Sequence, residues 1–189
     1  MRGFLREALI IVIVAAAVFA VSRTAVQSFV VVGASMEPSI EEGQRLIIIK
    51  AIYHFREPQR GDVIVFHPPH NQPDYIKRII ALPGEWVEVK DGTVYIHTED
   101  GDVFPLDEPY IKEAPRHPFE GDTIPENEYF VLGDNRNNSN DSRNGWTVGR
   151  QAIIGKAWLS IWPPSDWGLA PNYPLQQQLA SAELLPQLP

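Results

Sequence analysis

Apolar and polar positions are unevenly distributed, with one continuous apolar run near the start and short β-branched runs after it. Residues 8–21 (ALIIVIVAAAVFAV) contain no polar side chain, and Ala, Leu and Ile favour helix there. A helix that spans a bilayer needs about 20 apolar residues. The run reaches this length if Phe4, Leu5 and residues 24–26 extend it and the flanking charges reach the interfaces. The pattern therefore predicts an N-terminal membrane helix.

The charges around this run allow two interpretations of it. Arg2 and Arg6 precede the run and Arg23 follows it, which gives a weak positive-inside bias for an uncleaved anchor. A cleavable signal peptide has the same basic start and apolar core, with small residues such as those near Ala20. Both interpretations place the rest of the chain outside the cytoplasm.

After the run, β-branched and aromatic segments alternate with segments that contain Gly, Pro, Asp or Asn, which is typical of short strands joined by turns. Strands are predicted within residues 28–33, 44–53, 61–67, 75–82, 85–98, 128–134 and 152–162. Two alternating stretches flank Asp91 and Gly92, a dipeptide typical of a β-hairpin turn. Residues 38–42 are a candidate short helix. The pattern predicts a mostly β domain.

Two segments differ in composition from the predicted β core. Residues 98–127 are rich in proline and acidic residues, and we expect an insertion or an extended loop. Residues 168–189 contain several prolines and a run of glutamines at 176–178, which predicts an extended or disordered tail. We therefore divide the chain into a membrane anchor at 1–26, a β-rich domain at 27–167 and the tail.

Composition excludes several kinds of site in this chain of 189 residues. Asp and Glu number 24 against 16 Lys and Arg, so the net charge is -8 and a nucleic-acid partner is not expected. The absence of cysteine excludes disulfides, thiolate zinc sites and a cysteine nucleophile.

Ser35 follows the apolar run, in the stretch VVVGASMEPSI at residues 30–40. A serine hydroxyl is a weak nucleophile until a base takes its proton. The Gly-x-Ser-x-Gly pattern fails because Glu37 holds its last position, and the Ser-x-x-Lys pattern fails at Pro38. The histidines have no partner pattern around them, at His54, His67, His70, His97 and His117.

Lys77 is the best candidate base, because it lies within the apolar stretch DYIKRIIALPGE at residues 74–85. In a strand, Lys77 shares a face with Tyr75 and Ile79. Apolar surroundings lower the pKa of a lysine, and a neutral lysine can act as a general base. The alternative is an edge strand from which Lys77 or Arg78 points to solvent.

Four sequence blocks follow the apolar run in order, namely SMEPSI (35–40), RGDVIVF (60–66), DYIKRIIALPGE (74–85) and GDNRNNSNDSRNGWTVG (133–149). Together they resemble type I signal peptidases, the membrane-bound serine proteases that remove signal peptides. The resemblance spans most of residues 1–162 but excludes the tail and much of 98–127. It implies an antiparallel, barrel-like β domain with one N-terminal transmembrane helix.

The resemblance also implies a Ser/Lys dyad, with Ser35 as the nucleophile and Lys77 as the general base. Some members have a serine at the position of Gly33, and its hydroxyl helps to bind the oxyanion. In this chain the oxyanion hole would consist of the Ser35 N–H and a second donor that the sequence does not identify.

The polar block at residues 133–149 allows several interpretations. A calcium loop of the EF-hand type fails because Gln151 stands where the loop needs Glu. A long Asn-rich turn is the simplest interpretation. The resemblance implies that Ser139 hydrogen-bonds the lysine amine, and that Asp141 and Arg143 form a charged pair beside the site. That pair could equally hold the loop without a part in the chemistry.

Signal peptides carry small residues at the first and third positions before the cut, so a signal peptidase needs two shallow apolar pockets. The resemblance gives six candidates to line them, Phe29, Val31, Met36, Ile40, Tyr75 and Ile76. Ordinary core packing is the alternative for each residue. Candidates for contact with the lipid interface are Trp146, Trp158, Trp162 and Trp167.

The predicted function is that of a membrane-anchored serine endopeptidase that removes N-terminal signal peptides from exported preproteins. We expect a single-pass protein of the plasma membrane with its catalytic domain on the extracytoplasmic side. The expected partners are signal peptides and membrane lipid, with the secretion machinery as a further candidate, and no cofactor or metal is expected. The alternatives are a dedicated maturation protease of the same Ser/Lys type and a catalytically silent, membrane-tethered β-rich binding module.

Overall fold

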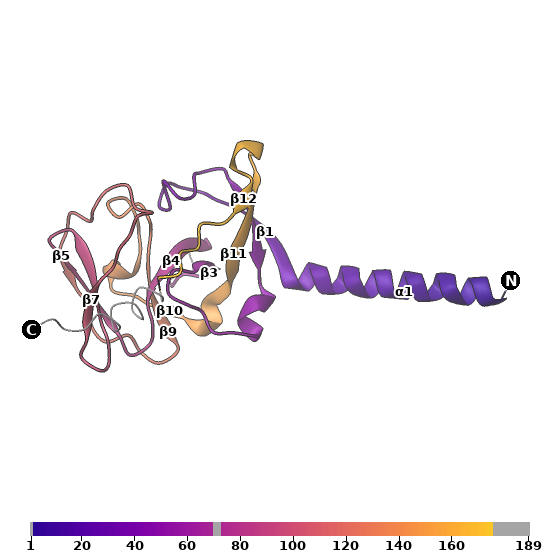
Figure 1. The fold of residues 1–189 in the computed structure, drawn as a ribbon, viewed down its shortest axis with the longest axis horizontal. Coiled ribbons are helices and arrows are strands. Elements are labelled where there is room, and N and C mark those ends of the chain that lie inside the picture. Colours follow the sequence, from indigo (N-terminus) through magenta and orange to yellow (C-terminus); the bar gives the residue numbers. More distant parts are fainter. Residues whose placement is uncertain (1, 70–72, 176–189) are drawn as a thin grey trace, which may run out of the picture.

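The computed structural model describes residues 2–69 and 73–175 of the chain. One long helix, α1 (Arg2–Ala25), leads into a domain built of antiparallel strands. Figure 1 shows α1 projecting from one end of this domain, with β5 (Trp86–Lys90) and β7 (Val103–Pro105) at the opposite end. The mostly β, antiparallel prediction is confirmed.

The predicted N-terminal helix forms as α1. Over the described part of the chain, no helix has both the length and the apolar character that a membrane crossing requires.

The larger sheet has eight strands in the order β1-β2-β11-β3-β4-β9-β10, with β12 paired to β11. All its pairings are antiparallel. Its strands are β1 (Val26–Val30), β2 (Arg45–Ile49), β3 (Val63–Phe66), β4 (Tyr75–Ala81), β9 (Glu128–Leu132), β10 (Val148–Gly149), β11 (Ile153–Trp162) and β12 (Gly168–Leu169). The predicted β-branched runs supply these strands, and β4 lies in the interior of the sheet between β3 and β9.

The smaller sheet has four strands in the order β7-β6-β5-β8, namely β7 (Val103–Pro105), β6 (Thr93–His97), β5 (Trp86–Lys90) and β8 (Phe119–Glu120). The predicted hairpin is confirmed, because β5 and β6 pair across Asp91 and Gly92, both of which have positive φ. Residues 98–127 supply β7 and β8 to this sheet, so the predicted insertion is partly structured by strand pairing.

Short 3₁₀ helices connect several of these strands, at η1 (Ala51–His54), η2 (Ser142–Asn144), η3 (Arg150–Ala152) and η4 (Pro164–Asp166). The candidate helix at residues 38–42 was a wrong prediction, because the chain forms turns there instead.

We predicted that the tail begins at residue 168, but the folded domain continues beyond this position. Residues 168–169 form β12, and the side chain of Leu175 is buried in the core. Asn172 Oδ1 accepts a hydrogen bond of 2.8 Å from Val63 N, which ties this segment to β3. The folded domain therefore continues at least to Leu175. Residues 176–189, with the glutamine run, lie outside the described part of the chain.

Candidate active site

Ser35 lies in a turn that follows β1 and is fixed to the core on both sides. Met36 and Ile40 are fully buried, and Ile40 N donates to Met36 O at 2.9 Å. Asn135, from the polar block, donates through its backbone N–H to Ser35 O and through its side-chain amide to Ala34 O, both at 3.0 Å. These contacts hold Ser35 partly exposed, while Met36 beside it is buried.

Lys77 lies at the centre of β4, opposite Ile64 of β3, and only 3% of its surface is exposed. Its Nζ is 2.6 Å from Ser35 Oγ and donates to Ile76 O at 2.9 Å. The ring of Tyr75 faces the same amine, with its centroid 5.2 Å from Nζ. The edge-strand alternative for Lys77 is wrong, because β4 pairs on both sides and the side chain points into the protein.

The surroundings of Lys77 change its acid–base behaviour. Burial lowers the pKa of Lys77 to about 8, since an amine shielded from water is less stable in its charged form. The carboxylates of Asp141 and Asp134 oppose this shift, because negative charge favours the protonated amine. The result is a lysine that is partly neutral near neutral pH and lies in contact with a serine hydroxyl.

Ser139 does not make the predicted hydrogen bond to the lysine amine. Its Oγ is buried and finds no hydrogen-bond partner within the described residues. The amine of Lys77 is directed instead to Ser35 Oγ and to the carbonyl of Ile76. Ser139 nevertheless lies close to the site, because a side chain at Gly133 would clash with both Ser139 Oγ and the carbonyl oxygen of Ser35.

Asp141 and Arg143 form the predicted charged pair through two contacts, Arg143 Nε to Oδ1 at 2.8 Å and Nη2 to Oδ2 at 2.9 Å. Asp141 is fully buried and also accepts a hydrogen bond from Gly133 N at 3.1 Å. Arg143 donates in addition to Arg136 O. The pair therefore joins both ends of the polar loop, and its carboxylate lies close enough to influence the pKa of Lys77.

A second buried pair, Arg78 with Asp134, links β4 to the polar block. Arg78 donates through Nε to Oδ1 at 2.8 Å and through Nη2 to Oδ2 at 2.6 Å, and neither side chain is exposed. Consecutive strand residues point to opposite faces, so this pair lies on the face of β4 opposite to Lys77. We did not predict it, although an arginine inside an apolar strand signals a buried partner.

A groove of about 560 Å³ contains Ser35 and Lys77. Three of the predicted pocket residues line it, namely Phe29, Tyr75 and Ile76. The other three predictions are corrected, because Val31, Met36 and Ile40 do not line the groove and are buried in the hydrophobic core, against which Ile76 also packs. Groove residues that the sequence did not suggest include Asp74, Asn138 and Asn140.

Asn140 closes one side of this groove. Its Nδ2 donates to the hydroxyl of Tyr75 at 3.1 Å, so the polar loop contacts the aromatic ring that faces Lys77. No histidine of the described chain lines the groove. The described residues also contain no cluster of His, Asp and Glu that could hold a metal ion.

Gly33 occupies the left-handed region of backbone space, with φ at 87°, which favours glycine over any residue with a side chain. Its N–H donates to Glu42 Oε1 at 3.1 Å. The N–H of Ser35, by contrast, has no hydrogen-bond acceptor among the residues that the structure describes. This N–H is therefore available to a ligand in the groove.

Comparison with known proteins identifies relatives across most of the chain. The family model described as "Signal peptidase, peptidase S26" matches residues 4–162. A "Probable signal peptidase I-1" of Synechocystis sp. is 46% identical over 71% of this chain and 70% of its own length. A "Signal peptidase I" of Leptolyngbya laminosa is 43% identical over 74% of this chain and 71% of its own.

Among solved structures, a signal peptidase I from Enterococcus faecalis V583 covers 53% of this chain and 97% of its own, with 36% identity and a TM-score of 0.47.

Proposed function

Because the chain belongs to the signal peptidase family, peptidase S26, we propose that it is a serine endopeptidase that removes N-terminal signal peptides from exported preproteins at a membrane. The observation that carries the proposal is the contact of 2.6 Å between Lys77 Nζ and Ser35 Oγ. A buried lysine with a pKa of about 8 suits the role of general base, because its neutral form is accessible at physiological pH.

In the proposed reaction, neutral Lys77 takes the hydroxyl proton while Ser35 Oγ attacks the carbonyl carbon of the scissile peptide bond. The protonated amine then gives this proton to the leaving nitrogen, and the C–N bond breaks to leave an ester on Ser35. Lys77 next takes a proton from water, which attacks the ester and releases the signal peptide. Protonated Lys77 returns that proton to Ser35 Oγ.

The oxyanion that forms during each attack needs hydrogen-bond donors. We assign the Ser35 N–H as one donor, because it has no acceptor within the described residues and belongs to the attacking residue itself. Gly33 has no side chain to act as a second donor, and its N–H already donates to Glu42.

The groove favours small side chains next to the scissile bond. Phe29, Tyr75 and Ile76 supply apolar contact surface beside the Ser35 hydroxyl. Tyr75 is held from one side by Asn140 and from beneath by Phe66 and Trp146, at centroid distances of 6.2 and 6.4 Å. This fixed ring restricts the space for a bulky residue, which agrees with the small residues that precede signal-peptide cleavage sites.

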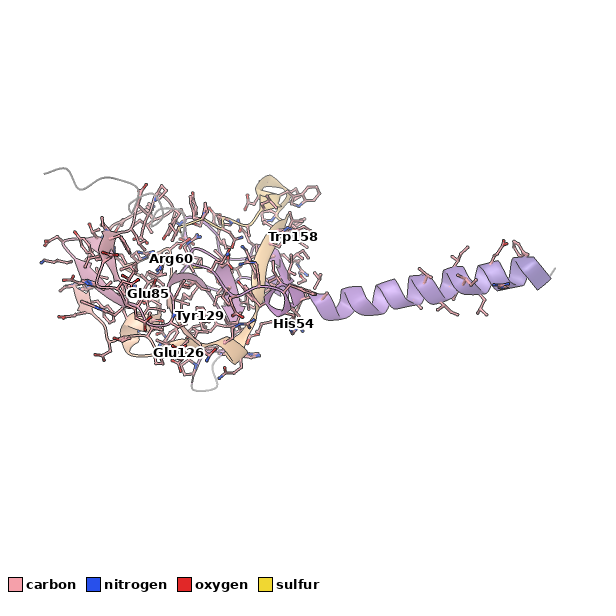
Figure 2. All side chains as sticks on the ribbon, turned by 60° about the horizontal axis from the view of Figure 1, so that its bottom comes forward. His54, Arg60, Glu85, Glu126, Tyr129 and Trp158 are labelled. Carbon is pink, nitrogen blue, oxygen red and sulfur yellow. The ribbon has the colours of Figure 1, made fainter. Side chains whose placement is uncertain are left out.

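Membrane association is proposed to involve α1 and an aromatic edge of the β domain. Apolar side chains from Leu9 to Val14 are exposed along α1, an arrangement that water disfavours. The exposed apolar side chains on β11, on β12 and on the residue between η4 and β12 are Trp158, Trp162, Trp167 and Leu169. Figure 2 shows Trp158 at the end of the domain from which α1 leaves. Trp146 is excluded from this surface, because it packs against Phe66 and Tyr75.

This arrangement would hold the groove close to lipid, where a signal peptide emerges. Arg2 and Arg6 before the apolar run favour a cytoplasmic N-terminus with the β domain on the other side. Retention of the full chain in the membrane pellet after alkaline carbonate extraction tests the attachment. Protease added to intact cells tests the side of the membrane on which the β domain lies.

The decisive test of the chemistry is incubation of the detergent-solubilised full chain with a preprotein, followed by gel analysis of the mature product. Ser35→Ala and Lys77→Arg should both abolish cleavage, since arginine retains the charge but cannot act as a base. Ser39→Ala is the matched serine control and should remain active, because Ser39 lies outside the groove. Cleavage by folded Ser35→Ala at the wild-type rate would contradict the proposal.

Several unrelated preproteins distinguish a general signal peptidase from a dedicated maturation protease. The general enzyme should cleave each of them after small residues, whereas the dedicated protease should cleave only one. A catalytically silent binding module should cleave none.

A further inference from the structure

A second pocket lies where α1 meets the β domain, and it is separate from the groove that contains Ser35. Its volume is about 380 Å³. It is lined by the last residue of α1, by Arg150 with the start of β11, and by Lys50, Ala51, Tyr53 and His54. The backbone N–H of Lys50 donates to Ala25 O at 2.8 Å. The pocket is thus fixed directly beside the end of α1.

The polar lining of this pocket is predominantly basic, although the chain as a whole has a net charge of -8. Arg150 donates through Nε to Glu57 Oε2 at 3.0 Å and through Nη2 to the carbonyl of Tyr53, and these two bonds orient its guanidinium. The Nη1 amino group of Arg150 has no hydrogen-bond partner within the described chain. The arginine can therefore bind a further acceptor without losing either bond.

Lys50 adds a positive charge that the surrounding residues do not balance. Glu57 is paired with Arg150, and no carboxylate of the described residues forms an ion pair with Lys50. The nearby cations Arg56 and Lys156 differ in this respect, because both pair with Asp62. The exposed ring of His54 supplies another N–H donor at the mouth of the pocket.

We infer that this pocket binds a phosphate group, with Lys50 and Arg150 as its cationic ligands. Ammonium and guanidinium groups form short, charge-assisted hydrogen bonds with phosphate oxygens, and the free Nη1 of Arg150 offers such donors. The phosphate can come from the head group of an anionic phospholipid or from free inorganic phosphate.

The position of the pocket favours the lipid, an argument that rests on the proposed attachment of α1 to the membrane. Figure 2 shows His54 and Trp158 at the end of the domain from which α1 leaves. Cations and exposed tryptophans on the same side of a protein are typical of contact with head groups. A head group bound beside Ala25 would fix the β domain relative to the lipid surface.

Isothermal titration of the full chain in a neutral detergent tests the site with three probes. The probes are dihexanoyl phosphatidylglycerol, dihexanoyl phosphatidylcholine and inorganic phosphate. Phosphatidylglycerol should bind saturably, and Lys50→Gln should weaken its binding about fivefold, as expected for the loss of one cation at an anionic head group. Lys50→Arg retains the charge and should bind as the wild type does.

The matched control is Lys90→Gln, which removes an exposed lysine at the end of β5 in the smaller sheet. It should leave binding unchanged. Binding of phosphatidylglycerol in preference to phosphate supports a lipid source, and equal binding of the two with dependence on Lys50 supports free phosphate.

Three results would overturn the phosphate site. They are the absence of saturable binding by either anionic probe, equal weakening by Lys50→Gln and Lys90→Gln, and equally tight binding of phosphatidylcholine that does not depend on Lys50. The last result would indicate contact with the acyl chains alone. Because no readout uses cleavage, a negative result here is distinct from a failure of the proposed peptidase reaction.

Discussion

The pH dependence of cleavage follows directly from the surroundings of Lys77, because only the neutral amine can accept the proton of Ser35. Burial lowers the pKa of Lys77 to about 8, so about one molecule in eleven is in the neutral form at pH 7. At pH 9 the neutral share is about ten in eleven. The rate should therefore rise about tenfold from pH 7 to pH 9 and then level off.

A lysine with the ordinary pKa of 10.5 gives a clearly different profile. The rate would then rise about 100-fold between pH 7 and pH 9, with no plateau in that range. The position of the plateau thus distinguishes a buried base from an exposed one. A role for the protonated amine predicts the opposite slope, with a rate that falls as the pH rises.

The appropriate quantity to measure is kcat/KM, because its pH dependence reports the pKa values of the free enzyme. A peptide substrate without groups that titrate between about pH 6 and pH 10 keeps the profile specific to the protein. Far-ultraviolet circular dichroism at each pH controls for unfolding. A flat profile from pH 7 to pH 9 would refute the assignment of Lys77 as the general base.

Three further predictions concern the construction of the site. Gly133→Ala should lower kcat strongly, because its Cβ would clash with the carbonyl oxygen of Ser35 and displace the turn that carries the nucleophile; steady-state kinetics of the folded variant measures this. Tyr75→Phe and Asn140→Ala remove the same hydrogen bond, so kcat/KM of the double variant should fall no further than that of either single variant. Lys77→Met should raise the free energy of unfolding at pH 7 by about 1 kcal/mol, as urea titration would show.

Much of the fold could be predicted from local patterns in the sequence. The β-branched runs became strands because their side chains suit a pleated, half-buried surface. The hairpin at Asp91 and Gly92 could be predicted because both residues tolerate the positive φ that a tight turn requires. The residues that the sequence blocks singled out, Ser35 and Lys77, lie in contact although 42 positions separate them.

Other features depend on contacts between distant parts of the chain, which local patterns do not encode. Met36 and Ile40 lie in a turn, where neither strand nor helix periodicity indicates which side chains face the core. The hydrogen bond from Val63 N to Asn172 spans 109 positions, so a proline-rich segment that lacks periodicity still belongs to the fold. The pair of Arg78 and Asp134 likewise spans 56 positions.

The stabilising effect expected for Lys77→Met is the counterpart of its proposed role as a base. The pKa of Lys77 is about 8 in the folded protein against an ordinary 10.5, so the folded state binds fewer protons between these values than the unfolded state does. Stability therefore rises with pH from about 8 to about 10.5, and the full penalty applies below pH 8. The shift corresponds to about 3 kcal/mol, from which the loss of two hydrogen bonds in Lys77→Met subtracts about 1 kcal/mol each. The advantage of Lys77→Met should thus be largest at pH 7 and be lost by about pH 9, whereas Lys90→Met, on the exposed end of β5, should show no such dependence. An equal gain in stability at both pH values would show that the titration of the buried amine is not its cause.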